Sequence, residues 1–352
     1  MEPDRKADDQ LLVENFNYCL PERLIAQTPV EPRDHSRLMV LDKKTETIHH
    51  RNFFDLPEFI NSGDVLVFND SRVISARLYG WLSENQRPVE LLLLRQIESG
   101  LWESLVKPGR RMREGADFFI KNDEGKTLKG SVESILQEGI RLVRFDAGFD
   151  TEEYGEIPLP PYIKQSVSDP NRYQTVYSKY PGSVAAPTAG LHFTEGLLQK
   201  IRNKSAQIVY VTLHVGWGSF KPVKAKDFGE HIMHSEYWRL SEEAANTINQ
   251  AKREGRKVIS VGTTATRLLE NAADKSLGGI LNRAEGWADI FITPDYKFKV
   301  VDSLVTNFHL PKSTLLLLTS ALGGKDFIFK AYQEAVKREY RFYSFGDGML
   351  IL

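Results

Sequence analysis

Gly63-Asp-Val-Leu-Val-Phe-Asn-Asp70 is the stretch that decides the fold class of this chain. It is a continuous apolar run that stops abruptly at polar residues, which is typical of a strand buried on both faces of a sheet. The same pattern recurs at 208–213, 258–261 and 290–292, where the apolar run meets His, Gly or Thr. Several strands of this kind predict a sheet that is covered by helices.

The segments between these runs predict helices with recognisable first residues. Thr194 and Ser241 each precede apolar residues at helical spacing, and Asp326 does the same near the carboxyl end of the chain. Strands that alternate with helices predict right-handed crossover units and a mostly parallel sheet, here over residues 13–74 and 149–352. The ligand site of such a sheet lies at the carboxyl ends of its strands.

Residues 75–148 follow a different pattern. Short runs of alternating apolar residues recur about every ten residues, and turns rich in Gly, Asn and Asp separate them. These runs cover 89–94, 102–106, 117–120 and 142–145. The pattern predicts a small all-β barrel inserted into the α/β chain. Residues 1–12 are charged and aperiodic, and we expect them to form a mobile tail.

The composition is that of a soluble globular protein. Of the 352 residues, 41% are hydrophobic and 26% are charged. No apolar stretch approaches the roughly 20 residues needed to cross a bilayer, and the N-terminus carries no secretory core. The single cysteine, Cys19, excludes an intramolecular disulfide framework. These features predict a cytoplasmic protein without membrane contact.

The net charge of −1 gives the molecule no overall attraction for nucleic acid. Any such binding must therefore use a local cluster of cations. The densest cluster consists of Lys107, Arg110, Arg111 and Arg113, which we define as the basic patch. Smaller groups lie at 221–226, 252–257 and 337–341. A solvated charged face is the alternative interpretation of each group.

Several common enzyme motifs are missing from the sequence. It contains no Gly-x-Gly-x-x-Gly turn after an early strand and no Gly-x-x-x-x-Gly-Lys-Ser/Thr loop, which disfavours dinucleotide-binding enzymes, ordinary methyltransferases and P-loop proteins. His231 and His234 lie three residues apart between Glu230 and Glu236, in an order that does not match a helical zinc motif. We therefore expect a hydrogen-bonded polar cluster there and predict no metal site.

Two segments near predicted strand ends carry groups that are suited to chemistry. Asp70 and Arg72 could bind a ligand or form an ion pair that holds their loop. His192 lies just before the helix predicted to start at Thr194, where backbone N–H groups could hold an anion while the imidazole moves a proton. The alternative is a helix cap beside a core histidine. By themselves, these residues predict an α/β enzyme but no substrate.

Long motifs run through nearly the whole chain after residue 15. They are FNYCLPERLIAQ at 16–27, SRLMVL at 36–41, GDVLVFNDSRVISARL at 63–78, LPPYI at 159–163, YQTVY at 173–177, AAPTAGLHFT at 185–194, TLHVGWGSFKPV at 212–223, EHIMHSE at 230–236, GTT at 262–264, TNFHLP at 306–311 and YRFYSFGDGMLI at 340–351. At these motifs the chain closely resembles the S-adenosylmethionine:tRNA ribosyltransferase-isomerase family of queuosine biosynthesis. Trp217, Ser219 and Gly348 depart from the family pattern, which concerns the fine shape of the pocket.

The resemblance implies a barrel-like α/β large domain with an inserted β-barrel. It also implies that the ribosyl part of S-adenosylmethionine is transferred to 7-aminomethyl-7-deazaguanine at the tRNA wobble position, giving epoxyqueuosine, adenine and methionine. S-adenosylmethionine is thus a cosubstrate, and no bound cofactor is expected. A cosubstrate that donates its sugar is consistent with the missing methyltransferase fingerprint. Partners are therefore tRNA and S-adenosylmethionine, and we expect a monomer.

The resemblance does not assign the catalytic groups, so we predict them from the chemistry. The sulfonium acidifies the C5′ protons, and a base that is neutral near pH 7 is needed to remove one. We predict His192 as this base, because the positive end of a helix dipole lowers the pKa of an imidazole. His214 and His309 are the other candidates.

Further side chains are predicted to bind or orient the substrates. Asp70 and Asp347 could orient an imidazole or face the sulfonium, and Arg72 or Arg341 could bind a carboxylate or a phosphate. Other substrate-binding positions are predicted at Thr188, Gly190, Gly216 and Thr263. The basic patch is predicted to contact the tRNA.

Two alternative functions compete with this prediction. One is a non-catalytic tRNA-binding module with the same fold, and the other is a methyltransferase with an unusual site. Retention of the charged and imidazole positions in the motifs argues against the first. The absent glycine fingerprint argues against the second.

Overall fold

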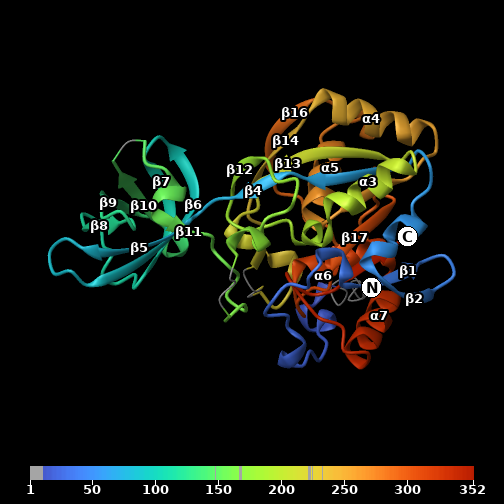
Figure 1. Ribbon diagram of the computed structural model, residues 1–352, viewed down its shortest axis with the longest axis horizontal. Coiled ribbons are helices and arrows are strands. Elements are labelled where there is room, and N and C mark those ends of the chain that lie inside the picture. Colours follow the sequence, from blue (N-terminus) through green and yellow to red (C-terminus); the bar gives the residue numbers. More distant parts are fainter. Residues whose placement is uncertain (1–10, 147, 166–168, 221–222, 224, 232) are drawn as a thin grey trace, which may run out of the picture.

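The structure is a computed structural model that describes residues 11–146, 148–165, 169–220, 223, 225–231 and 233–352. Its strands form a nine-stranded sheet, a seven-stranded sheet and a two-stranded sheet. In Figure 1 the seven-stranded sheet lies at the left, and the nine-stranded sheet with most of the helices lies at the right. No helix among the described residues is long and apolar enough to cross a membrane.

The nine-stranded sheet carries the predicted apolar strands at its centre. Its strands, in spatial order, are β16 (Ala284–Ala288), β14 (Glu236–Leu240), β13 (Gln207–Leu213), β3 (Val65–Asn69), β15 (Val258–Val261), β17 (Ser303–Asn307), β18 (Gly348–Ile351), β1 (Arg37–Asp42) and β2 (Thr47–Asn52). Neighbouring strands from β13 to β17 are parallel, and so are β18 and β1. Every residue of β3, β15 and β17 is buried, as the apolar runs predict.

The prediction of a mostly parallel, barrel-like large domain is wrong outside this centre. The pairs β16–β14, β14–β13, β17–β18 and β1–β2 are antiparallel, so the sheet is mixed. A turn of only four residues joins β1 to β2, and such a short connection permits only antiparallel pairing. The edge strands β16 and β2 do not pair with each other among the described residues, so the sheet is open.

The predicted strand at 290–292 is also absent, although this segment is described. Ile292 is buried in the apolar cluster around α6 and α7 instead. The apolar side chains of 290–292 therefore pack in the core, and the segment does not form a strand of the sheet. The next strand, β17, begins eleven residues after Ile292.

Among the described residues, all helices except the first pack on the nine-stranded sheet, and the first packs against the barrel. Three of them lie where the sequence predicts helices. The helices are α2 (Thr151–Tyr154), α3 (Glu195–Asn203), α4 (Glu242–Arg253), α5 (Thr263–Asp274), α6 (Thr314–Gly323) and α7 (Lys325–Lys337). Thr194 and Ser241 cap α3 and α4 by accepting backbone N–H groups of Leu197 and Ala244, as predicted. For α7 the cap is Gly324, and Asp326 lies inside the first turn.

The inserted segment forms a closed six-stranded barrel, which confirms the prediction of a small β-barrel. The order is β5 (Arg77–Leu82), β6 (Pro88–Glu98), β7 (Leu101–Lys107), β10 (Arg141–Phe145), β9 (Thr127–Ile135) and β8 (Asp117–Lys121), and β8 pairs with β5 to close the ring. Gly80 allows this closure, because a Cβ there would lie 2.5 Å from the carbonyl oxygen of Phe119. After the barrel, β11 (Gly155–Glu156) pairs with β5.

A short two-stranded sheet continues from the centre of the molecule. It joins β4 (Ser71–Val73), which follows β3 after one residue, to β12 (Tyr180–Ser183). Gln174 holds β4 through its side-chain amide, which accepts from the N–H of Val73 and donates to its carbonyl. Strand β4 thus leads from the carboxyl end of β3 towards the barrel (Figure 1).

Candidate active site

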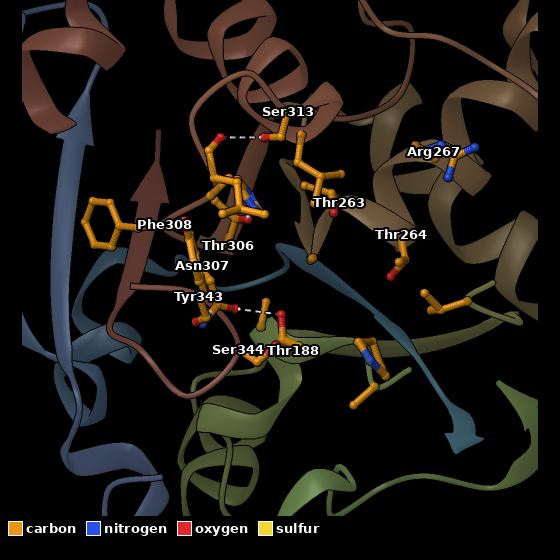
Figure 2. A pocket seen from close by; sticks show the side chains of 18 of the residues that line it. Thr188, Thr263, Thr264, Arg267, Thr306, Asn307, Phe308, Ser313, Tyr343 and Ser344 are labelled. Atoms are coloured by element: carbon orange, nitrogen blue, oxygen red, sulfur yellow. Dashed lines mark hydrogen bonds between the residues drawn. The ribbon is translucent and has the colours of Figure 1, made fainter. Parts of the chain in front are cut away.

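The carboxyl ends of β15 and β17 open onto a pocket, which we call the strand-end pocket (Figure 2). It has about 780 Å³ of empty space, part of which is open to solvent. Its walls combine apolar side chains with a few hydroxyl, amide and imidazole groups. The polar lining residues are Tyr162, Thr188, Thr263, Thr264, Arg267, Thr306, Asn307, His309, Ser313, Tyr343 and Ser344. The pocket thus lies at strand ends, where the sequence predicts a ligand site.

A chain of hydrogen bonds runs from the pocket wall to His192. Thr188 Oγ1 donates to Oδ1 of Asn307 at 3.1 Å, and Nδ2 of Asn307 donates to the carbonyl of Tyr343 at 3.0 Å. The carbonyl can only accept, which fixes the orientation of the Asn307 amide. Nδ2 also lies 3.1 Å from Nε2 of His192, so Nε2 accepts. The proton of this imidazole is therefore on Nδ1, which lies 2.7 Å from Oγ of Ser36.

His192 lies behind the pocket rather than on its wall. Its ring is 4% exposed and stacks on Phe53 with centroids 4.5 Å apart. Burial, together with the smaller effect of the Arg341 and Arg33 charges, lowers its pKa to about 3. The imidazole is neutral, as predicted, but desolvation is the main cause and the predicted helix dipole is not needed. Both ring nitrogens are engaged, so His192 holds Asn307 in place.

His309 is the imidazole on the pocket wall. It follows β17 and is 8% exposed, and its Nε2 lies 2.8 Å from Oγ1 of Thr306. Its Nδ1 has no hydrogen-bond partner among the described residues. Burial lowers the pKa of His309 to about 3. Its backbone is fixed, because the N–H donates to the Tyr332 hydroxyl and the carbonyl accepts from Tyr18.

Arg267 is a pocket residue that the sequence analysis missed. It lies on α5, one helical turn after Thr263, and both residues line the strand-end pocket. Its Nη1 donates to Oε2 of Glu236, and these side chains are 6% and 3% exposed. Its Nε and Nη2 are buried without a partner among the described residues. The signal was the Thr263-Thr-Ala-Thr-Arg267 run, which places Thr263 and Arg267 on one helix face.

Asn307 and Asn69 were also missed. Each is the last residue of a strand: Asn307 ends β17 and Asn69 ends β3. Nδ2 of Asn69 donates to the carbonyl of Leu213 at 2.9 Å and to Oγ1 of Thr264 at 3.3 Å. The sequence analysis predicted the adjacent acidic residue, Asp70, as the site residue instead. The amide matters here because a single side chain can both donate and accept.

Asp70 and Arg72 do not come together. Asp70 accepts from Oγ1 of Thr212 at 2.7 Å and lines a cleft beside Tyr177 and Arg239. Burial raises the pKa of the Asp70 carboxyl, opposed by the Thr212 hydrogen bond. Arg72 instead reaches Ser178 at 3.4 Å, and the two residues form no ion pair with each other in the described part of the chain. Neither lines the strand-end pocket.

His214 and Gly216 line a second cavity, between the barrel and the nine-stranded sheet, which we call the inter-sheet cleft. By the same measure it has about 1810 Å³ of empty space. Burial lowers the pKa of His214, and its Nδ1 is buried without a described partner. The N–H of Gly216 donates to Oε1 of Glu236 at 2.9 Å. Val215, between them, lines both the cleft and the strand-end pocket.

Three further predicted site residues make contacts that support the fold. Asp347 is 1% exposed, and its carboxylate accepts from Nε and the backbone N–H of Arg37 and from the N–H of Arg341. The Arg341 side chain donates to the carbonyl of Thr28. Gly190 is required by close packing, because a Cβ there would lie 2.0 Å from the Tyr177 hydroxyl. None of the three lines the strand-end pocket.

The basic patch lies at the end of β7 in the barrel. Lys107, Arg110 and Arg113 are exposed, and Arg111 is half-buried with Nη1 3.5 Å from the carbonyl of Pro88. The four cations form no ion pair with other described residues. Three cations of the smaller groups form ion pairs: Lys252 with Asp302, Arg256 with Glu254 and Arg338 with Glu334. Lys221 and Lys224 lie outside the described residues.

The pair of histidines at 231 and 234 makes different contacts from those of a metal site. The ring of His231 lies 6.0 Å from that of Phe291, and the ring of His234 packs against Gly218. The carboxylate of Glu236 binds Arg267 and the N–H of Gly216. Among the described residues no group of three His, Cys, Asp or Glu side chains is placed to hold a metal ion.

The chain is similar over nearly its whole length to proteins of one kind. Relatives named S-adenosylmethionine:tRNA ribosyltransferase-isomerase share 53% identity in Acetivibrio thermocellus, over 96% of this chain and 99% of the relative, and 52% in Clostridioides difficile, over 96% and 98%. A crystal structure of S-adenosylmethionine tRNA ribosyltransferase from Thermotoga maritima is 38% identical, covers 96% of this chain and all of its own, and has a TM-score of 0.55.

The family comparison agrees with these pairwise similarities. The model of the family described as queuosine biosynthesis protein matches residues 13–351. The match includes both the barrel and the nine-stranded sheet, and it includes every residue of the strand-end pocket. This chain therefore belongs to the queuosine biosynthesis protein family, together with the S-adenosylmethionine:tRNA ribosyltransferase-isomerases that it resembles in sequence.

Proposed function

We propose that this chain transfers and isomerises the ribosyl part of S-adenosylmethionine onto 7-aminomethyl-7-deazaguanine at the wobble position of tRNA. The products are epoxyqueuosine-tRNA, adenine and methionine. The names of the relatives, at 52–53% identity over almost the full length, support this substrate pair. The strand-end pocket carries the proposal on the structural side, because it combines neutral imidazole, hydroxyl and amide groups with apolar walls.

S-adenosylmethionine is proposed to bind in the strand-end pocket. Thr188, Thr263 and Asn307 supply hydrogen-bonding groups for the sugar and the base. Phe308, Leu315 and Val215 supply apolar surface, which excludes water from a reactive intermediate. The Asn307 amide accepts a hydrogen bond from Thr188 and donates to the Tyr343 carbonyl and to His192. Because these bonds fix its orientation, the amide needs little reorganisation when substrate binds.

His309 is proposed as the acid–base group, with His192 in a positioning role. Removal of a C5′ proton beside the sulfonium leaves an electron pair that forms a C4′=C5′ double bond as the C4′–O4′ bond breaks. The electrons on O4′ then form a C1′ carbonyl and expel adenine, which takes up a proton as it leaves. His309 lines the pocket and its Nδ1 has no described partner, whereas Nε2 of His192 already accepts from Asn307. Burial keeps the His309 imidazole neutral, so one of its ring nitrogens carries no proton at neutral pH.

The fate of isotopic label tests the reaction. The purified protein is incubated with tRNA carrying 7-aminomethyl-7-deazaguanine and with S-adenosylmethionine labelled either in the methyl group or in the ribose. Ribose label is expected in the tRNA, with free adenine and methyl-labelled methionine in solution. Methyl label in the tRNA would establish a methyltransferase instead. Tight tRNA binding without any adenine release would establish a non-catalytic binding module.

A further inference from the structure

We propose that the inter-sheet cleft binds the target nucleotide of the RNA out of its base stack, against an aromatic wall formed by His214, Tyr237 and Trp287. This inference rests on the proposed function and names the part of the molecule that receives the RNA. It places the modified base in the cleft and S-adenosylmethionine in the adjoining strand-end pocket.

The three rings of the aromatic wall lie in sequence along one side of the cleft. The rings of His214 and Tyr237 are nearly parallel, with centroids 5.8 Å apart and planes at 16°. The Trp287 ring stands at 70° to Tyr237 with centroids 5.8 Å apart. Trp287 is 44% exposed, although an indole gains free energy from burial. Exposed aromatic faces of this kind bind unpaired bases by stacking, whatever the base.

Gly182 leaves the space that the His214 ring of the wall occupies. A Cβ at Gly182 would lie 2.9 Å from the imidazole of His214, too close for any other residue. The backbone N–H of His214 donates to the carbonyl of Tyr237 at 2.9 Å, which ties the two ring-bearing residues together. The wall is therefore formed before the RNA binds, and stacking a base on it orders little of the protein.

Cations surround the wall. The Arg95 guanidinium lies over one face of the Trp287 ring, 5.2 Å from its centroid, and is held by Glu103, so a positive charge is fixed at the wall. Arg72 and Lys179 also line the cleft, and neither forms an ion pair with a described residue. Of the two acidic residues on the barrel side, Glu152 is occupied by Ser75 and Asp150 caps α2. The cleft thus offers phosphate-binding groups next to base-binding groups.

The cleft adjoins both other parts of the proposed site. Val215 lines the cleft and the strand-end pocket, so a base on the wall can present its substituent towards the cosubstrate. Strand β7 runs from Trp102, in the cleft, to Lys107, in the basic patch. Five residues of strand span about 17 Å, so an RNA strand could contact both regions at once.

Alanine variants of the wall test the inference. The probe is an anticodon stem-loop RNA with 7-aminomethyl-7-deazaguanine at the target position, and the same RNA with an abasic target position. Trp287→Ala and Tyr237→Ala are expected to weaken binding of the intact RNA by about tenfold or more, because each removes a ring on which the base stacks. Both variants should bind the abasic RNA as the wild type does. Trp287→Phe should retain most of the affinity.

The matched control is Trp81→Ala. Trp81 is 37% exposed on the barrel, stacks on Phe119 and does not line the cleft, so its removal should leave RNA binding unchanged. The KM for S-adenosylmethionine should be the same in all variants. An equal loss of affinity for intact and abasic RNA, or no loss in either wall variant, would overturn the inference. Absence of adenine release by the wild type would overturn the proposed function, while the abasic comparison would still test the wall.

Discussion

Glu236 and Arg267 form a buried ion pair that lies between the two cavities of the proposed site. Glu236 lines the inter-sheet cleft, and Arg267 lines the strand-end pocket. One carboxylate oxygen binds Nη1 of Arg267 and the other accepts the N–H of Gly216, so the pair joins β14, α5 and the segment after β13. The ion pair fixes the spacing between the two binding regions.

Breaking this pair is expected to destabilise the protein strongly. Arg267→Met leaves the Glu236 carboxylate buried without its countercharge, which costs about 3–5 kcal/mol in comparable proteins. Urea unfolding of the variant measures this loss. Arg267→Met combined with Glu236→Gln should recover much of the stability, because no unpaired charge remains and the amide oxygen can still accept from Gly216. Arg23→Met, in the exposed pair with Glu339, should change stability little. A small effect of Arg267→Met would show that the pair is hydrated.

His309→Asn is expected to lower the rate of adenine release by at least about 10²-fold. The amide preserves much of the side-chain size but cannot accept a proton at neutral pH, so the affinity for S-adenosylmethionine should change little. Single-turnover release of adenine and equilibrium binding measure the two effects. His49→Asn is the control, since His49 is an exposed residue of β2. If His309→Asn keeps the wild-type rate while His192→Asn abolishes release, the acid–base role belongs to His192.

The two buried imidazoles predict a loss of stability in acid. The pKa of His192 and of His309 is about 3 in the folded state, against an ordinary value of 6.5. Below pH 6.5 the unfolded chain therefore binds more protons than the folded one, and stability falls as the pH is lowered from 6.5 towards 3. Each imidazole contributes a slope of about 1.4 kcal/mol per pH unit in this window.

Unfolding free energies measured by urea at several pH values test this dependence. His309→Gln should reduce the slope between pH 6 and about pH 4 by the share of one imidazole. An unchanged slope in His309→Gln would mean that this ring is protonated in the folded state.

Charge reversal in the basic patch is expected to weaken tRNA binding. Arg110→Glu with Arg111→Glu should lower the affinity and reduce the dependence of log K on log salt by about one for each phosphate that the protein no longer binds. S-adenosylmethionine binding should not change. Lys121→Glu with Lys129→Glu makes the same change of charge elsewhere on the barrel, on the exposed residues of β8 and β9. Equal reductions of affinity in the two double variants would mean that overall charge governs binding and that the patch makes no specific interaction with the tRNA.

Local pattern in the sequence was enough to predict many elements. The apolar runs at 63–68, 208–213 and 258–261 are strands of the nine-stranded sheet, because a strand that is buried on both faces must be apolar throughout. The helix starts at Thr194 and Ser241 are confirmed for an equally local reason, since a cap involves residues only three apart. The alternating runs and turns likewise identified the barrel.

Long-range pairing was beyond the reach of these patterns. The antiparallel strands β14, β16 and β18 depend on partners far away in the chain, and the apolar run at 290–292 packs into the core instead of pairing. Helix α6 was missed because it is apolar on nearly every side, and a buried helix has no periodic polar face to reveal it.

The sequence by itself determined the inserted barrel, the family and the buried central strands of the large sheet, and it predicted a site at strand ends. Only the tertiary structure decided which side chains form that site. It placed His309 on the pocket wall and His192 behind it, separated Asp70 from Arg72, and paired Glu236 with Arg267. The physical reason is that strand periodicity and helix caps are set by neighbouring residues, whereas the burial and hydrogen-bond partners of an ionisable group depend on the tertiary fold. For Asp70 and His192 these partners lie more than a hundred positions away in the chain. These partners, and not the residue type, fix the pKa of such a group and its access to a ligand.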